Sequence, residues 1–375
     1  MTLDPAVYHV DEAGLLTPAL AIYPAIVRHN IQCMIRALGG EPSRWRPHLK
    51  TVKLEAMMKL VVDAGVTTAK CATTLELLTA CRSGFSDVLV AYPHSGRNAQ
   101  RVAAIAAEFP GVRISALVES DAQVEQWTGT AVELFIDINP GMNRTGIERD
   151  HPEAIRQVAF RIRSEGLVFR GLHFYDGNST EPDFAERTQR AQARYAELLG
   201  VASFLENAGI PVPEIVTAGT PALPCVIPYE PLWKGSFRHQ VSPGTIVYND
   251  SSSLKQLPAD YGFQPAVIVI SRVISHPKTG VVTCDAGHKS VSVDSGVPNC
   301  LVLGHPSLEA QKPSEEHLPF ALGDSSPAPA IGDALYLLPR HVCPTVNNFD
   351  RAALVENGAV TSLESVSARG REGPL

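Results

Sequence analysis

Short runs of β-branched and apolar residues alternate with longer amphipathic segments between residue 45 and about residue 248. This alternation is typical of repeated βα units, in which helices cover a parallel sheet. Apolar residues at i, i+3, i+4 and i+7 predict helices at Leu54–Ala64, Thr74–Ser83, Arg97–Glu108, His151–Ser164 and Asp183–Ala208. The expected strands are Trp45–Lys50, Thr68–Ala72, Asp87–Tyr92, Arg113–Val118, Val132–Ile138, Phe169–Tyr175, Glu214–Ala218 and one within Phe237–Tyr248.

Eight parallel strands with helical crossovers predict a closed (β/α)8 TIM-type barrel, whose functional groups gather at the carboxyl ends of the strands. An open, doubly wound sheet would instead gather them at one switch point. In this chain the distinctive side chains follow several different strands. They are Lys50, Tyr92, His94, Arg144, Tyr175, Asp176, Gly219 and Thr220.

After residue 250 the sequence changes to β-rich runs separated by loops rich in proline and serine. A chain of 375 residues also exceeds the size at which one hydrophobic core usually stops growing. We therefore expect a separate C-terminal β domain. Its strands are expected at Ala266–Ile274, Gly280–Asp285, Ala334–Leu338 and Ala353–Val355.

The charge balance narrows the possible partners. The net charge is −7, and no basic run of five residues occurs, which argues against nucleic acid or an anionic membrane as the main partner. The absence of a long apolar stretch and of a signal-peptide pattern predicts a cytoplasmic protein. Seven scattered cysteines without a CxxC pair indicate neither a disulfide framework nor a zinc finger. We expect a small-molecule partner.

Lys50 ends the first expected strand, within the run RPHLKTVK at residues 46–53. An amine held in a partly dry pocket loses proton affinity and becomes a nucleophile toward carbonyl groups, as covalent attachment of pyridoxal phosphate (PLP) requires. The alternative is that Lys50 and Lys53 are two solvated loop lysines.

Three further segments offer polar groups at expected strand ends. The small-residue turn at 217–221 could cradle a phosphate or be a plain turn. Arg144 is a fixed cation that could face a ligand or pair with Asp137 at the surface. Asp176 could act as a base if burial raises its pKa, or could cap the following turn.

His341 and Cys343 follow the β run Ala334–Leu338. On an extended segment, residues at i and i+2 point to the same face, so the two side chains could bind one ion. Imidazole and thiolate ligands favour zinc over magnesium or calcium. A buried histidine and cysteine without metal is the alternative.

These segments resemble motifs of the D-threonine aldolase and D-serine dehydratase family, which shares its fold with alanine racemase. The resemblance runs from Thr17 to Arg369 and rests on several boxes in the family's order. In this sequence they read RPHLKTVK at 46–53, DINPGMNRTG at 137–146, GLHFYDGN at 171–178, TAGTP at 217–221, SPGT at 242–245, DAGHKS at 285–290, HVCPT at 341–345 and VSARG at 366–370.

The resemblance implies that Lys50 carries PLP, that Gly219 and Thr220 bind its phosphate and that Arg144 lies beside its ring oxygen. His48, Tyr175 and Tyr248 are expected to complete the cofactor site. The resemblance also implies a divalent metal, zinc or manganese, at His341 and Cys343, and a homodimer. The expected domains are a PLP-binding barrel at 26–250 and a β-rich domain at 251–375 that includes residues 1–25.

Two branches of the family are mixed in this chain. Cys343 is typical of the dehydratases, whereas residues 344–350 and 366–370 resemble the aldolase C-terminus. Asp176 stands where many aldolases have a histidine base, and Ser242 stands where arginine is usual. We expect aldolase-like cleavage of D-β-hydroxy-α-amino acids to glycine and an aldehyde, with Asp176 as a substitute base. D-serine dehydratase-like elimination, an amino-acid racemase and a non-catalytic PLP carrier are the alternatives.

Overall fold

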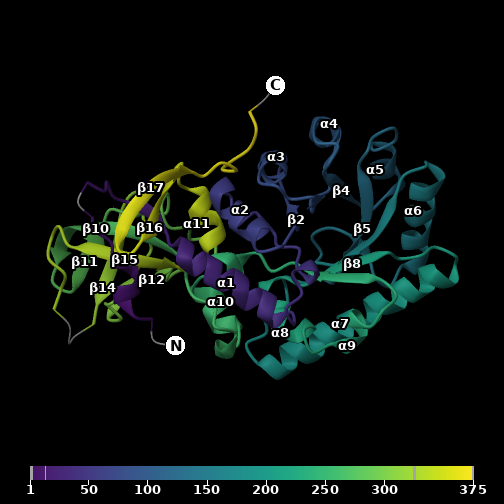
Figure 1. The fold of residues 1–375 in the computed structure, drawn as a ribbon. Coiled ribbons are helices and arrows are strands. Elements are labelled where there is room, and N and C mark those ends of the chain that lie inside the picture. The colour runs from purple at the N-terminus through teal and green to yellow at the C-terminus, as the bar shows by residue number, and fades with distance from the viewer. Residues whose placement is uncertain (1–2, 13, 324–326, 374–375) are drawn as a thin grey trace. The chain divides into compact units, whose positions relative to one another are not determined.

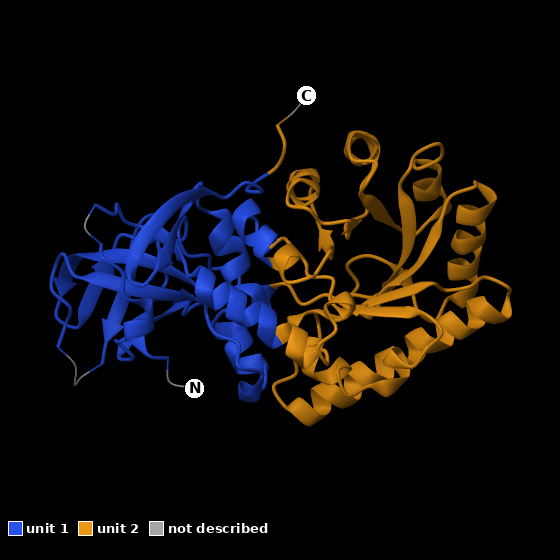
Figure 2. Cartoon of the chain, in the orientation of Figure 1, with its two compact units in different colours: residues 1–33, 51–60, 245–370 blue, residues 34–50, 61–244, 371–375 orange. Residues whose placement is uncertain are grey.

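The computed structural model describes residues 3–12, 14–323 and 327–373, and the chain divides into two compact units (Figures 1 and 2). Residues 34–50, 61–244 and 371–375 form one, called here the barrel unit, and residues 1–33, 51–60 and 245–370 form the other, the β unit. The units differ from the expected domains because residues 26–33, 51–60 and 245–250 group with the β unit, whereas residues 371–373 group with the barrel unit. Side chains explain this grouping, since the Asn30 amide donates to Val247 O and Gln264 O.

The barrel unit is built on a parallel sheet whose order follows the sequence. Each neighbouring pair is parallel, and the strands begin and end within about three residues of the expected positions. The two-residue strand β6 (Ile147–Glu148) lies off this order and pairs with the last two residues of β5. The others are β2 (Thr68–Cys71), β3 (Asp87–Val90), β4 (Arg113–Val118), β5 (Glu133–Asn139), β7 (Phe169–His173), β8 (Glu214–Thr217) and β9 (Arg238–Val241).

The first expected strand, residues 45–50, forms isolated bridges rather than a regular strand. Trp45 bridges Val241 of β9 and His48 bridges Lys70 of β2, both in parallel. The carbonyl of Pro47 accepts a hydrogen bond from Lys70 N at 2.9 Å. Because Pro47 has no N–H to donate, a continuous ladder of hydrogen bonds cannot form. The segment still lies between the last and the first strand and closes the barrel as its eighth member. The expected (β/α)8 barrel is therefore confirmed.

Helices follow the strands of the barrel unit, and local caps fix where several begin. Thr73 accepts from Glu76 N before α3, and Asp183 accepts from Glu186 N before α7. Leu89, Leu117, Phe135 and Val216, from four different strands, form a buried cluster inside the barrel. The helices are α3 (Thr74–Arg82), α4 (Gly96–Glu108), α5 (Asp121–Glu125), α6 (Pro152–Ser164), α7 (Phe184–Asn207), α8 (Leu223–Val226) and α9 (Glu230–Trp233).

Buried ion pairs, named here the amino-end cluster, lie where the barrel strands begin. Asp87 and Glu214 open β3 and β8, and each pairs with both Arg46 and Arg170, at 2.5 to 3.4 Å. Arg170 also reaches Glu133 of β5 at 2.7 Å. Burial alone would raise the pKa of Asp87, but the two arginines outweigh it and lower this pKa to about 2. The amino end of the barrel is thus filled by charges that satisfy one another.

The β unit is built on a mixed sheet in the order β13-β14-β11-β10-β1-β16-β17, with β15 pairing β10 and β12. The N-terminal strand β1 (Ala19–Ile22) lies inside this sheet, antiparallel to β10 and parallel to β16. The other strands are β10 (Val267–Lys278), β11 (Val281–Cys284), β12 (Cys300–Val302), β13 (Leu308–Ala310), β14 (Leu318–Leu322), β15 (Ala334–Pro339), β16 (Arg351–Glu356) and β17 (Ala359–Ser365).

Four further helices complete the described chain (Figure 1). They are α1 (Pro24–Ala37), α2 (Glu55–Asp63), α10 (Ser251–Gln256) and α11 (Val342–Asn347). In the described residues, no helix combines the length and the apolar character that a membrane crossing would need.

Candidate active site

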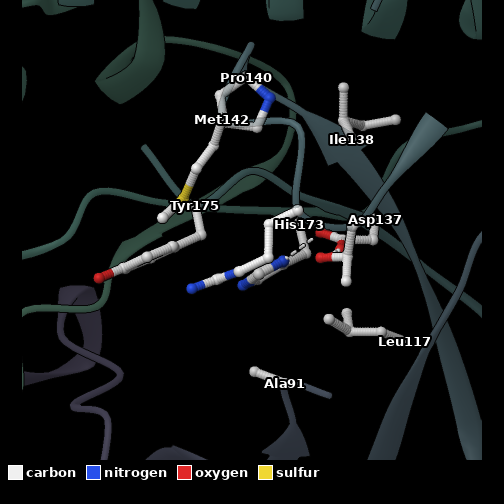
Figure 3. Close-up of a pocket in the computed structure, with 10 residues that line it drawn as sticks. Ala91, Leu117, Asp137, Ile138, Pro140, Met142, His173 and Tyr175 are labelled. Carbon is white, nitrogen blue, oxygen red and sulfur yellow. Dashed lines mark hydrogen bonds and ion pairs between the residues drawn. The ribbon is translucent and has the colours of Figure 1, made fainter. Parts of the chain in front are cut away.

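A pocket opens at the carboxyl ends of the barrel strands (Figure 3). His173 ends β7 and Tyr175 follows it two residues later, so the alternation of the strand brings both side chains to the pocket. Asp137 of β5 faces His173 in Figure 3, while Leu117 and Ile138 supply apolar walls. The pocket thus lies at the end of the barrel where the sequence predicts the site.

A chain of hydrogen bonds runs from a buried lysine through a histidine to an aspartate. Lys70 Nζ lies 3.2 Å from His173 Nε2, and His173 Nδ1 lies 2.7 Å from Asp137 Oδ1. Thr145 Oγ1 donates to the other oxygen of Asp137 at 2.7 Å. Burial lowers the pKa of His173, so its imidazole tends to stay neutral. Sequence reasoning missed Lys70, although a lysine inside a fully buried strand such as β2 was a usable signal.

Three cations face the ring of Tyr175. Lys50 Nζ lies 5.7 Å from its centroid, and Lys70 Nζ and Arg144 Cζ each lie 5.0 Å from it. Burial, and then the charge of Lys50, lowers the pKa of Lys70 to about 7 and lowers the pKa of His48 well below its ordinary value. The pocket therefore carries an excess of positive charge, which suits an anionic ligand.

Asp176 directly follows Tyr175 in the chain and is fully buried. Its carboxylate accepts from the Tyr195 hydroxyl and, at 3.1 Å, from Gly219 N. Burial raises the pKa of Asp176, which is the shift that a general base at this position would need. Both oxygens are already occupied, however, so these contacts assign Asp176 to anchoring Tyr195 and the turn at Gly219. Its action as a base stays a prediction, and the geometry counts against it.

Gly219 follows β8 where the chain passes close to Tyr175. A Cβ on Gly244 would lie 2.2 Å from His48 O, so close approach to backbone requires glycine there. A Cβ on Gly219 would lie 3.0 Å from Tyr175 Cε2, a tight contact that the tyrosine ring would have to relieve by shifting. Thr220 is buried at the start of a 3₁₀ turn. Because Gly219 N already donates to Asp176, this N–H is not available to a phosphate in the present arrangement. The phosphate role of Gly219 and Thr220 stays a prediction.

Tyr248 belongs to the β unit, where its side chain is fully buried. Its hydroxyl donates to Val52 O at 2.7 Å, and burial raises its pKa well above the ordinary value. The contact fixes the start of the segment 51–60 within that unit. A role for Tyr248 at the cofactor stays a prediction.

His341 and Cys343 are brought together in the β unit, but not by the geometry expected. The segment is not extended: α11 begins at Val342, with His341 as its N-cap residue and Cys343 in its first turn. A hydrogen bond nevertheless joins the two side chains, and His341 Nδ1 lies 2.6 Å from Asp294 Oδ2. Burial lowers the pKa of His341, but Cys343 and Asp294 outweigh it and raise this pKa to about 9. The Thr51 hydroxyl lies 2.9 Å from Cys343 Sγ.

Asp294 was not identified from the sequence, because 47 residues separate it from His341. A carboxylate that holds one nitrogen of an imidazole leaves the other to bind metal, an arrangement common around metal-binding histidines. The pair thus fits a metal site with solvent or substrate as further ligands. Among the described residues, one group of three acidic or histidine side chains has its possible metal-ligand atoms within 4.8 Å of one another. This group is Glu148, Asp150 and His151, which are exposed and do not belong to the His341 site.

Comparison with known proteins places this geometry in a family. The family model "Alanine racemase, N-terminal domain" matches residues 22–252, well over half of the chain. The chain belongs to this family. A second model, "Putative serine dehydratase domain", matches residues 266–355. The resemblance inferred from the sequence boxes is confirmed by these matches and by the relatives that follow.

Full-length relatives include both aldolases and a dehydratase. A 3-hydroxy-D-aspartate aldolase of Paracoccus denitrificans is 28% identical, over 98% of this chain and 95% of the relative. A D-threonine aldolase of an Arthrobacter species is 25% identical, over 94% and 93%. The solved structure of D-threonine aldolase from Filomicrobium marinum is 25% identical with a TM-score of 0.86, covering 96% of this chain and 98% of that one.

The alanine racemase-like fold of this family member is also supported by a more distant structure. D-threo-3-hydroxyaspartate dehydratase from Delftia sp. HT23 has a TM-score of 0.80 at 23% identity, over 96% of this chain and 99% of that one. At this identity the likeness bears on the fold alone. It supports the expected combination of an α/β barrel and a separate β-rich unit.

Proposed function

We propose that the protein is a PLP-dependent lyase that cleaves D-β-hydroxy-α-amino acids into glycine and an aldehyde. The observation that carries this proposal is the cationic pocket at the carboxyl ends of the barrel strands, where Lys50, Lys70 and Arg144 surround Tyr175. It is supported by full-length relatives that are D-threonine and 3-hydroxy-D-aspartate aldolases. The cations of the pocket suit an anionic cofactor, and the relatives supply the reaction class.

The residues present fit PLP. The cofactor carries a phosphate and a ring oxygen, both negative, and the pocket has positive charge in excess. Lys50 would hold the cofactor covalently, and Arg144, a permanent cation, would face the ring oxygen. Tyr175 would pack against it, with His48, Gly219 and Thr220 completing the site. When bound, PLP supplies an electron sink for the bonds that break at Cα.

We propose that a divalent metal binds at His341 and Cys343. A thiolate and an imidazole favour zinc, with manganese as the alternative, and Asp294 would fix the orientation of the imidazole. As a Lewis acid the metal would acidify the β-hydroxyl of the substrate. Chelation should abolish turnover while leaving thermal unfolding nearly unchanged, since two ligands contribute little to folding. Full activity of a His341→Ala, Cys343→Ala double variant would end the metal proposal.

Elimination is the second candidate, favoured by Cys343 and by the serine dehydratase model over residues 266–355. The relative D-threo-3-hydroxyaspartate dehydratase of Delftia is 24% identical over 93% of this chain. In this reaction the metal would stabilise departing hydroxide rather than acidify the hydroxyl. The full-length aldolase relatives are slightly more similar, at 25% to 28%.

D-threonine separates the two candidates because its products differ. Cleavage yields acetaldehyde and glycine, whereas elimination yields 2-oxobutyrate and ammonia. The experiment incubates PLP- and zinc-loaded protein with D-threonine and measures all four products, with L-threonine as the control. We expect acetaldehyde and glycine from D-threonine alone. Dominant 2-oxobutyrate would transfer the protein to the dehydratase class, and the absence of all four products would refute a lyase of either kind.

A further inference from the structure

Lys70 is a buried amine that the expected cofactor site does not use. It lies in the middle of β2, whose four residues are all buried, and only 1% of Lys70 is exposed. Its Nζ lies 5.0 Å from the centroid of the ring of Tyr175, which lines the pocket. Lysine is rarely buried unless it is paired or functional. A buried lysine at this position therefore needs a hydrogen-bond partner.

That partner is His173, which is itself fixed. The Asp137 carboxylate can only accept, so His173 Nδ1 is the donor in their 2.7 Å contact. The neutral imidazole then has its lone pair on Nε2, which accepts from Lys70 Nζ at 3.2 Å. Thr145 holds the other oxygen of Asp137. The amine of Lys70 is therefore oriented by a chain of three groups rather than left to rotate.

The charges around Lys70 are of both signs. Burial and the cations Lys50 and Arg144 lower its pKa, whereas Asp137 and Asp176 raise it, and the result is about 7. His173 and His48 also face this region, and burial keeps the pKa of each below its ordinary value. In the ligand-free protein both the amine and the ammonium form are thus accessible near neutral pH. A group in this condition can take up and return a proton with little cost.

We propose that Lys70 is the acid–base residue of the lyase reaction, with His173 and Asp137 as its positioning residues; this rests on the proposed function. The neutral amine of Lys70 takes the proton of the β-hydroxyl. The O–H electron pair becomes the second C–O bond of the aldehyde, and the Cα–Cβ pair stays on Cα. Lys70 then returns the same proton to Cα, which gives glycine. No further reactant is needed.

The geometry of Asp176 supports this assignment by exclusion. Asp176 was the base expected from the sequence, but its oxygens accept from the Tyr195 hydroxyl and from Gly219 N. Lys70 faces the same ring as Lys50 and Arg144, the groups that would hold the cofactor. Of the two side chains considered as the base, Lys70 is therefore the one whose polar group faces the ring of Tyr175.

The test compares Lys70→Met and Lys70→Arg with the wild type, all loaded with PLP. Methionine removes the amine at similar length, and arginine keeps the charge but cannot act as a base. Lys234→Met is the matched control, since Lys234 lies in the same unit, is 72% exposed and pairs only locally with Glu230. We expect both Lys70 variants to lose 10²- to 10⁴-fold in kcat. The control should keep wild-type kcat.

Two pH measurements separate an acid–base role from a structural one. For the wild type, kcat/KM for D-threonine should rise through an apparent pKa near neutrality, and this limb should vanish in Lys70→Met. Without substrate, the absorbance of bound PLP should show a step in the same range, because a nearby charge changes, and this step should also vanish in Lys70→Met. The absorbance titration does not depend on turnover.

The outcomes divide clearly. A Lys70→Met variant that keeps both the limb and the step would overturn the proposal. Loss of PLP from that variant alone would assign Lys70 to cofactor binding and would also overturn it. If wild-type protein binds PLP but converts no D-threonine, the proposed function fails, while the absorbance step still reports whether Lys70 titrates in the pocket.

Discussion

The two ends of the barrel carry charged clusters of opposite design. At the amino ends of the strands, Asp87, Glu133 and Glu214 meet Arg46 and Arg170, and Arg113 adds a third cation from the surface at 2.7 Å from Glu133. The described contacts of this cluster therefore join three acids to three bases. Such a cluster needs no ligand to be electrically balanced.

At the carboxyl ends the balance is different. Lys50, Lys70 and Arg144 face Tyr175, and among the described residues the carboxylate bonded into this network is Asp137. Lys70 is buried, Lys50 is half-buried and Arg144 is exposed. Like charges gathered around one ring repel each other, so a fold retains them where a ligand or a reaction uses them. The comparison shows that charge imbalance, rather than the number of charges, distinguishes the functional end of this barrel from the structural one.

The largest expected effect is at the carboxyl ends of the barrel strands, called here the open end. Lys50→Met should remove the covalent attachment of PLP and reduce turnover by about 10⁴-fold or more, because the reaction loses its nucleophile. The free energy of unfolding should not fall, since one of several repelling cations is removed. Borohydride reduction of wild type and peptide mapping should place the pyridoxyl group on Lys50. Recovery of that group on Lys53, Lys70 or Lys289 would refute the assignment.

Arg170→Met tests the amino-end cluster, which lies at what is called here the closed end of the barrel. Arg170 is 2% exposed and bonds Asp87, Glu133 and Glu214, so its loss leaves buried carboxylates short of a partner. The free energy of unfolding should fall by about 3–5 kcal/mol, measured by urea denaturation. Activity per folded molecule at low temperature should stay near wild type. A neutral effect on stability would mean that the amino-end cluster contributes no net stabilisation.

Sequence patterns predicted the regular strands well because each pattern is local. Arg113–Val118 was predicted with the bounds that β4 has. The segment 45–50 was predicted as a strand because its apolar residues fit one, yet Pro47 removes a ladder donor. Residues 341–343 were taken as extended, although Pro344 in the first turn is a helix-start signal that could have been used.

The contacts that define the site are much less predictable. Lys70 and His173 are 103 residues apart, and Asp294 and His341 are 47 apart. Only the folded barrel or sheet brings such pairs within hydrogen-bond distance, so no local sequence pattern predicts these contacts. Family boxes identified Lys50 and Arg144, but they did not identify Lys70, which lies outside every box.

Acid should act on the closed end of the barrel through Asp87. Its pKa falls from 3.8 to about 2 on folding, so its stabilisation is fully present above pH 4 and is lost as the pH falls through 2. The shift corresponds to about 2 kcal/mol. Urea denaturation at pH 5 and pH 2 should show at least this loss for wild type and a smaller one for Asp87→Asn. Equal losses in both proteins would remove Asp87 from the acid response.

Lys70 should give the open end a different pH window. Its pKa falls from 10.5 to about 7 on folding, so between these values the unfolded chain binds more protons and stability rises with pH. In protein freed of PLP, Lys70→Met should flatten this rise. An unchanged slope between pH 7 and 10 would show that Lys70 is not held with a lowered pKa.

The smallest expected effect is at Asp176, and it distinguishes the two roles considered for this residue, structural anchor and general base. Because Asp176 anchors Tyr195 and Gly219, the Asp176→Asn substitution should lower the protein's free energy of unfolding by about 1–2 kcal/mol. The amide of asparagine can accept a hydrogen bond at only one of its two terminal atoms. Turnover should fall less than about tenfold, and PLP should be retained more weakly. Thermal unfolding, PLP titration and kcat measure the three quantities. A loss of two to four decades in kcat with unchanged PLP affinity would restore Asp176 as the general base and displace Lys70 from that role.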